Sequence, residues 1–133
     1  MALDLSSLNK AINSMERAMN RSQRTPDDEE LRDAVIQRFE YTYELCWKML
    51  KRQLEEESPY PSAVDALSFR DLLREGAEKG MIRCVEDWFV YREQRNITSH
   101  TYDENKAISV YNTALDFLPD ARDLLNELEK RQT

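Results

Sequence analysis

Glycine, proline and histidine are scarce in this 133-residue chain, which contains two glycines, four prolines and one histidine. A sheet protein of this length would need many more tight turns, so the lack of breakers favours long helices. The sequence also contains no run of about 18 apolar residues, the length that a membrane-spanning helix needs. We therefore expect an all-α bundle of about five helices, forming a single domain over residues 1–133 without a membrane segment.

A net positive charge is also lacking, because 26 acidic residues outnumber 19 lysines and arginines and give a formal net charge of -7 and a pI of about 4.8. Proteins that coat a nucleic-acid backbone usually have a basic face, so any contact with nucleic acid is expected to be local. Residues 1–4 lack the charged-then-apolar pattern of a secretory signal, and we expect a cytoplasmic protein. Cys46 and Cys84 fall in apolar helical segments, which predicts two buried free thiols and neither a disulfide nor a metal pair.

Apolar residues at helical spacing predict where the helices lie. The first covers residues 4–22 and has Arg17, Arg21 and Arg24 on its remaining surface. A long second helix begins after residues 25–28 and ends before Pro59. Three more are expected at residues 68–79, from about residue 83, and at residues 104–131, with Gly80 ending the third helix and Pro119 bending the last.

The inner face of the fourth helix turns polar along its length. Val85, Trp88 and Phe89 mark its core-facing stripe. At about 100° per residue the same stripe continues through five polar residues: Arg92, Arg95, Asn96, Ser99 and Asp103. Because an unpaired buried charge costs free energy, these side chains must face a cleft, a partner or water. This stretch is the candidate site.

The chemistry of the stretch suits phosphodiesters. His100 is the only histidine, which excludes a multi-histidine metal site within one subunit, and we find no carboxylate–histidine spacing that suggests a metal. Asn96 and His100 are one turn apart, and Arg95 and Tyr102 are two turns apart, so each pair would share a helix face. Arg95 and His100 converge only if the helix bends or a second copy contributes. An imidazole can exchange a proton with a ribose 2′-hydroxyl or a leaving oxygen while arginine holds the phosphate charge, and no metal or cofactor is needed.

The alternative is a solvated helix end, in which Arg95 pairs with a glutamate and His100 is a surface histidine. Glu40 and Glu44, one turn apart on the second helix, could face the site and pair with Arg95, although we favour a solvated face for both. Six aromatic residues fall at helical spacing and are expected to pack in the core or an interface, not to stack on bases: Tyr41, Tyr43, Trp47, Trp88, Phe89 and Tyr91. Arg92 adds positive charge beside Arg95, which predicts weak, salt-sensitive RNA binding.

Two segments resemble a known family. Residues 95–102, Arg-Asn-Ile-Thr-Ser-His-Thr-Tyr, resemble the arginine–asparagine, histidine-x-tyrosine signature of the HEPN superfamily, whose genes lie beside minimal nucleotidyltransferases. Residues 38–48 resemble the second helix of its nucleotidyltransferase substrate-binding branch. The resemblance implies an up-and-down bundle of four or five helices that forms a homodimer. Its two signature motifs would face each other across the interface, and a minimal nucleotidyltransferase would be the partner.

The resemblance also implies roles for single residues. In toxin members the arginine and histidine catalyse metal-independent RNA cleavage, which gives these roles to Arg95 and His100, with Asn96, Arg92 and Ser99 as substrate-binding candidates. In related pairs the nucleotidyltransferase attaches AMP to the tyrosine two places after the histidine, here Tyr102, which would mask the site. A second interpretation is a subunit that binds a substrate or nucleotide for the nucleotidyltransferase without hydrolysis. The chain has no nucleotidyltransferase Gly-Ser and paired-aspartate motif, so both interpretations require a partner protein.

Overall fold

The protein folds into six α-helices and one short 3₁₀ turn, as described by a computed structural model of residues 2–132. The elements follow one another as α1 (Ser6–Arg24), α2 (Glu29–Glu57), α3 (Pro61–Asp65), α4 (Phe69–Glu78), α5 (Val85–Ile97), η1 (Thr98–His100) and α6 (Glu104–Lys130). The described residues contain no β-strand, which confirms the predicted all-α class. The additional helix is α3, whose five residues are too few to show a helical repeat in the sequence.

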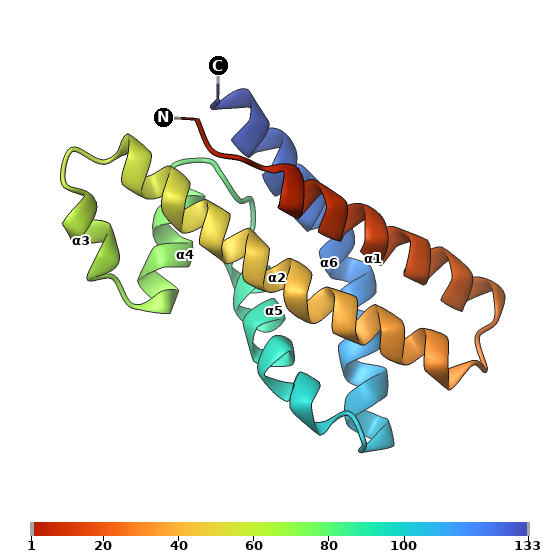
Figure 1. Cartoon of the computed structure of the whole chain (residues 1–133). Helices are drawn as coiled ribbons and strands as arrows, with labels where there is room; N and C mark the ends of the chain where they lie inside the picture. Colours follow the sequence, from red (N-terminus) through yellow and green to blue (C-terminus); the bar gives the residue numbers. More distant parts are fainter. Residues whose placement is uncertain (1, 133) are drawn as a thin grey trace.

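The long helices α1, α2 and α6 pack side by side and form the body of the bundle, as Figure 1 shows. The short helices α3 and α4 lie at one end of α2, and α5 descends from α4 to the turn that begins α6 (Figure 1). The two chain ends lie together at the opposite end of α6 from this turn, where the Leu3 amide donates a hydrogen bond to Gln132 Oε1 at 2.7 Å. Among the described residues no helix is long and apolar enough to cross a membrane.

An aromatic cluster around Phe117 forms the centre of the core. The Phe117 ring packs against Phe39 and Tyr91, each with ring centroids 5.1 Å apart, and against Trp88 at 5.7 Å and Tyr43 at 6.0 Å. These residues come from α2, α5 and α6, so the cluster joins three helices. It fixes α5 against α2, and α5 leads directly into the candidate site.

Two glycines shape α4: Gly80 ends the helix, and Gly76 allows it to approach α2 closely. Gly80 has a φ of 77° and ends α4 as predicted, because only glycine adopts this left-handed conformation without a steric penalty. The Met81 amide then donates to the Gly76 carbonyl at 2.9 Å. A Cβ atom at Gly76 would lie 3.0 Å from Leu50 Cδ1, so the absence of a side chain allows the two helices to approach.

The two cysteines differ in environment. Cys46 is buried in α2, and burial raises the pKa of its thiol, so the neutral thiol persists at physiological pH. Cys84 is free as predicted, but it is exposed, and the prediction that it would be buried is wrong. The physical reason is that α5 begins at Val85, which leaves Cys84 in the connection before the helix.

Candidate functional site

The candidate site begins where α5 ends, at Ile97. The predicted continuation of the helical stripe to Asp103 is wrong, because Thr98 to His100 form a 3₁₀ turn and Asp103 caps the next helix. The Thr98 hydroxyl lies 2.7 Å from the Arg95 carbonyl and 2.9 Å from Glu40 Oε2, and such side-chain bonds compete with helical ones. Asp103 Oδ1 accepts from the Lys106 amide at 3.2 Å and starts α6.

Arg95 forms an ion pair with α2. Its Nε lies 2.6 Å from Glu44 Oε1, and the two side chains are 32% and 28% exposed. Glu44 Oε2 also accepts a hydrogen bond from Trp47 Nε1 at 3.1 Å. The prediction of a solvated face for Glu40 and Glu44 is wrong, because both face the end of α5. The guanidinium that was predicted to hold a phosphate is therefore neutralised by a carboxylate within the single chain.

Arg92 lies one turn before Arg95 and is packed against an aromatic ring. Its guanidinium carbon lies 3.5 Å from the centroid of the Phe69 ring, a cation–π contact with α4. The Phe69 ring also stacks with Tyr43 of α2, with centroids 6.5 Å apart. Burial raises the pKa of the Tyr43 phenol, and the positive charge of Arg92 opposes this rise. Arg92 thus ties α5 to α4, and its side chain is half-buried.

His100 and Tyr102 are on the exposed turn between α5 and α6. Their rings are 6.1 Å apart in an edge-to-face arrangement, and Tyr102 is 87% exposed. His100, Asn96 and Ser99 are exposed too, and the His100 imidazole makes no hydrogen bond or ion pair with the rest of residues 2–132. The turn therefore presents an imidazole and a phenol to solvent, where a substrate or a partner protein can reach them.

The predicted set is thus divided between two environments. His100 and Tyr102 are in contact with each other, whereas Arg95 and Arg92 lie against α2 and α4. No hydrogen bond or ion pair joins Arg95 to His100 within the described chain. Arg95 and Tyr102 do not share a helix face as predicted, because α5 ends between them. Within one chain, the contact of Arg95 and the exposure of His100 match the alternative of a solvated helix end.

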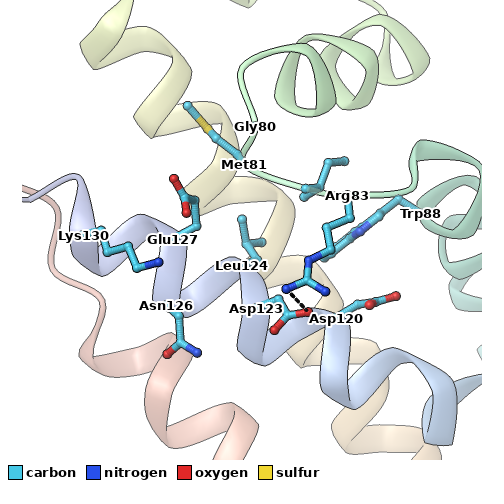
Figure 2. Close-up of a pocket in the computed structure, with 11 residues that line it drawn as sticks. Gly80, Met81, Arg83, Trp88, Asp120, Asp123, Leu124, Asn126, Glu127 and Lys130 are labelled. Carbon is cyan, nitrogen blue, oxygen red and sulfur yellow. Dashed lines mark ion pairs between the residues drawn. The ribbon is translucent and has the colours of Figure 1, made fainter.

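A separate pocket of about 180 Å³ lies where the connection between α4 and α5 crosses α6. Figure 2 shows Asp120 and Asp123 projecting from α6 beside Arg83, whose Nη2 lies 3.7 Å from Asp123 Oδ2, and Glu127 further along α6 near Met81. Asp120 also accepts a hydrogen bond from the Tyr91 hydroxyl. None of the signature residues lines this pocket. Residues 2–132 contain no cluster of three or more histidine, cysteine, aspartate or glutamate side chains placed to hold a metal ion.

The contact between Glu44 and Arg95 gives a testable prediction. Replacing Glu44 with glutamine removes the charge that pairs with Arg95 but keeps an oxygen that accepts from Trp47 Nε1. A partly exposed ion pair contributes little to the free energy of unfolding. We expect the free energy of unfolding to fall by about 0.5–1 kcal/mol in urea denaturation. Glu93→Gln, an exposed change on the same helix as Arg95, is the matched control and should leave it unchanged. A loss above about 3 kcal/mol would indicate a charge left buried and unpaired instead.

A comparison with known protein families identifies the family of this chain. A family model described as nucleotidyltransferase substrate binding protein like matches residues 3–130. The chain belongs to this family, which confirms the resemblance found in residues 38–48 and 95–102.

Three relatives agree with this assignment. The protein named "Probable ribonuclease HepT" of Haemophilus influenzae is 45% identical over 97 residues, which are 73% of this chain and 66% of that protein, just under two thirds of its length. A solved Haemophilus influenzae structure, described as the fold of a substrate binding domain of a nucleotidyltransferase, is 36% identical with a TM-score of 0.90, covering 95% of this chain and 99% of that one. A crystal structure from Thermus thermophilus is 28% identical with a TM-score of 0.75, covering 91% of this chain and 98% of that one.

Proposed function

We propose that this protein is a metal-independent endoribonuclease that pairs with a minimal nucleotidyltransferase, as a toxin whose activity is masked when AMP is transferred to Tyr102. The observation that carries the proposal is the exposed pair of His100 and Tyr102 on the turn that follows Arg95. The imidazole is a group that can transfer protons. AMP attached to the neighbouring phenol would block access to this imidazole. The name of the relative that is 45% identical, a probable ribonuclease, supports the same function.

The proposed cleavage is a transesterification. The ribose 2′-oxygen attacks the phosphorus, a bond forms between them, and the bond from phosphorus to the 5′-oxygen breaks. His100 takes the 2′-hydroxyl proton, a His100 imidazole of the proposed dimer delivers a proton to the leaving 5′-oxygen, and Arg95 stabilises the charge on the phosphate. Asn96 and Ser99 contribute neutral polar groups at the exposed end of α5, and Arg92 adds positive charge behind Arg95.

The proposed active form is a homodimer. Within one chain Arg95 is paired with Glu44 and is not linked to His100. A second copy facing the same turn would bring a second guanidinium and imidazole to the phosphate, and the substrate would compete with Glu44 for Arg95. The cytoplasmic location stays a prediction from the sequence.

A second candidate is a subunit that binds a substrate for the nucleotidyltransferase and does not cleave it. The ion pair between Arg95 and Glu44 favours this candidate, because it leaves the guanidinium occupied within the chain. The solved relative described as a substrate binding domain of a nucleotidyltransferase supports it as well. The two candidates are separated by incubating the purified protein with RNA in the presence of a chelator: cleavage supports the first, and intact RNA leaves the second.

Tyr102→Phe tests the proposed control. Because the side chain is 87% exposed and the hydroxyl makes no hydrogen bond within the described chain, the variant should keep its fold and its cleavage rate within about twofold. Incubation with the partner nucleotidyltransferase and ATP should add one AMP to the wild-type protein and none to the variant. In this step the phenol oxygen bonds to the α-phosphorus and pyrophosphate leaves. Intact-protein mass spectrometry makes the measurement, and AMP found on Tyr102→Phe would show that another residue is the acceptor.

A further inference from the structure

A stripe of basic side chains runs along the outer face of α1. Lys10, Arg17, Arg21 and Arg24 are all exposed, and at 100° per residue they lie within about 60° of one another around the helix. The guanidinium groups of the three arginines make no hydrogen bond or ion pair with the rest of residues 2–132. We call these four residues the α1 basic stripe. Lys10 interacts electrostatically with Asp4, whereas the three arginines place unpaired positive charge on a protein whose net charge is -7.

The α1 basic stripe borders a groove between α1 and α2. Lys10 and Arg17 line one side of this groove of about 510 Å³, and Tyr41 and Leu45 of α2 line the other. The Tyr41 ring is 38% exposed, and its hydroxyl hydrogen-bonds with Ser14 Oγ at 3.1 Å. The sequence predicts that this ring is packed, yet it is anchored by its hydroxyl at the groove with part of its surface open to solvent.

The α2 side of the groove carries positive charge as well. Arg38 Nη1 donates to a backbone carbonyl of α1 at 2.7 Å, while Lys48 and Arg52 are exposed on the same side of α2 by helical register. Three carboxylates of this register, Glu30, Glu55 and Glu56, lie towards the two ends of α2, and Glu44 at its edge is paired with Arg95. The groove itself is basic on the α1 side, through Lys10 and Arg17, and partly aromatic on the α2 side, through Tyr41, while the α2 cations lie next to it along the helix.

These dimensions suit a single strand of nucleic acid. Lys10 and Arg24 are 14 positions apart, which corresponds to roughly 21 Å along the helix. A basic groove that follows the backbone, with an aromatic ring on which a base stacks, is the usual way of binding a single strand. An acidic protein segment would use the cations but has no need of the exposed tyrosine.

We propose that the groove between α1 and α2 binds single-stranded RNA, with the α1 basic stripe holding backbone phosphates and Tyr41 stacking on a base. The surface is built from different residues than the exposed turn of His100 and Tyr102. It therefore stands apart from the proposed ribonuclease, although it would add RNA affinity to it.

The test uses the full-length His100→Ala protein, so that RNA is bound without being cut. Fluorescence anisotropy with a labelled single strand of about 12 nucleotides gives the Kd between about 50 and 200 mM salt. Adding Arg17→Glu and Arg21→Glu should raise the Kd at least about tenfold and reduce the slope of log K against log salt by about 1.4, since each lost phosphate contact removes about 0.7. Tyr41→Ala should raise the Kd about tenfold, and Tyr41→Phe should not raise it.

The matched control reverses two exposed arginines elsewhere, Arg74→Glu and Arg83→Glu, which changes the net charge by the same amount. Circular dichroism checks that each variant is folded. A Kd and salt slope unchanged by the α1 reversals, an equal loss in the control, or equally tight binding of double-stranded RNA would each overturn the proposal. The proposal would also be overturned if Arg17→Glu and Arg21→Glu left RNA binding unchanged but abolished binding to the nucleotidyltransferase, because the surface would then bind a protein partner.

Binding and cleavage remain distinguishable in this design. Wild-type protein that binds RNA through the stripe but leaves it intact overturns the ribonuclease and supports the groove. Protein that cleaves RNA but whose Kd is unaffected by the substitutions in the α1 basic stripe overturns the groove and supports the ribonuclease.

Discussion

Replacing His100 with alanine should lower the rate of RNA cleavage by about 10²- to 10⁴-fold, the usual contribution of a positioned acid or base. The imidazole is the group that exchanges a proton with the substrate in the proposed reaction, and the chain contains no other histidine to replace it. The loss should appear in initial rates measured with labelled RNA and excess chelator. The melting temperature should stay unchanged, because His100 is exposed and its ring contact is with Tyr102, itself on the surface.

The control for this experiment is Asn105→Ala, an exposed change at the start of α6 that removes no proposed catalytic group. It should retain full activity after the same purification. If His100→Ala cleaves RNA as fast as Asn105→Ala, the activity comes from another residue or from a contaminating nuclease, and the proposed mechanism fails. If His100→Ala unfolds, the histidine has a structural role that its exposure does not suggest.

Replacing Phe117 with alanine should have the largest effect on stability. The ring is fully buried and contacts four other aromatic rings from α2 and α5, and the surrounding helices cannot close the space that it leaves. We expect a loss of about 3–5 kcal/mol in the free energy of unfolding. The corresponding fall in melting temperature is on the order of 10–20 °C. Urea denaturation and thermal circular dichroism measure the two quantities.

Val90→Ala is the matched control for Phe117→Ala. Val90 is 46% exposed on α5, beside the same cluster in sequence, and its truncation should change the free energy of unfolding by no more than about 0.5 kcal/mol. A loss below about 1 kcal/mol for Phe117→Ala would mean that the aromatic cluster does not hold α5 against α2 and α6.

The long helices were predictable because their signals are local and repeated. Leu8, Ile12, Met15 and Met19 recur at helical spacing along α1 and are all buried. Gly80 marks the end of α4 by its backbone conformation alone. The end of α5 was not predictable in this way, because the helical stripe continues in the sequence past Ile97. The chain leaves the helix there through hydroxyl bonds of Thr98 and the cap of Asp103, which depend on geometry.

The candidate site was predictable in its residues but only partly in its contacts. The sequence identified Arg95, His100 and Tyr102 through their spacing and resemblance. The partner of Arg95 depends on how α2 and α5 are rotated against each other, and spacing within one helix does not determine that rotation. The packing of Arg92 on Phe69 likewise depends on how two helices are placed against each other, because Phe69 belongs to α4 and Arg92 to α5.

The proximity of the two chain ends bears on how the molecule can be engineered. Residues 3 and 132 are joined by a hydrogen bond, and the turn of His100 and Tyr102 lies at the far end of α6 (Figure 1). A tag or reporter attached next to residue 3 or residue 132 would therefore join the molecule a full helix length away from that turn. A short peptide linking residues 3 and 132 would also yield a circular permutant whose new ends open in an exposed loop, such as the one between α1 and α2.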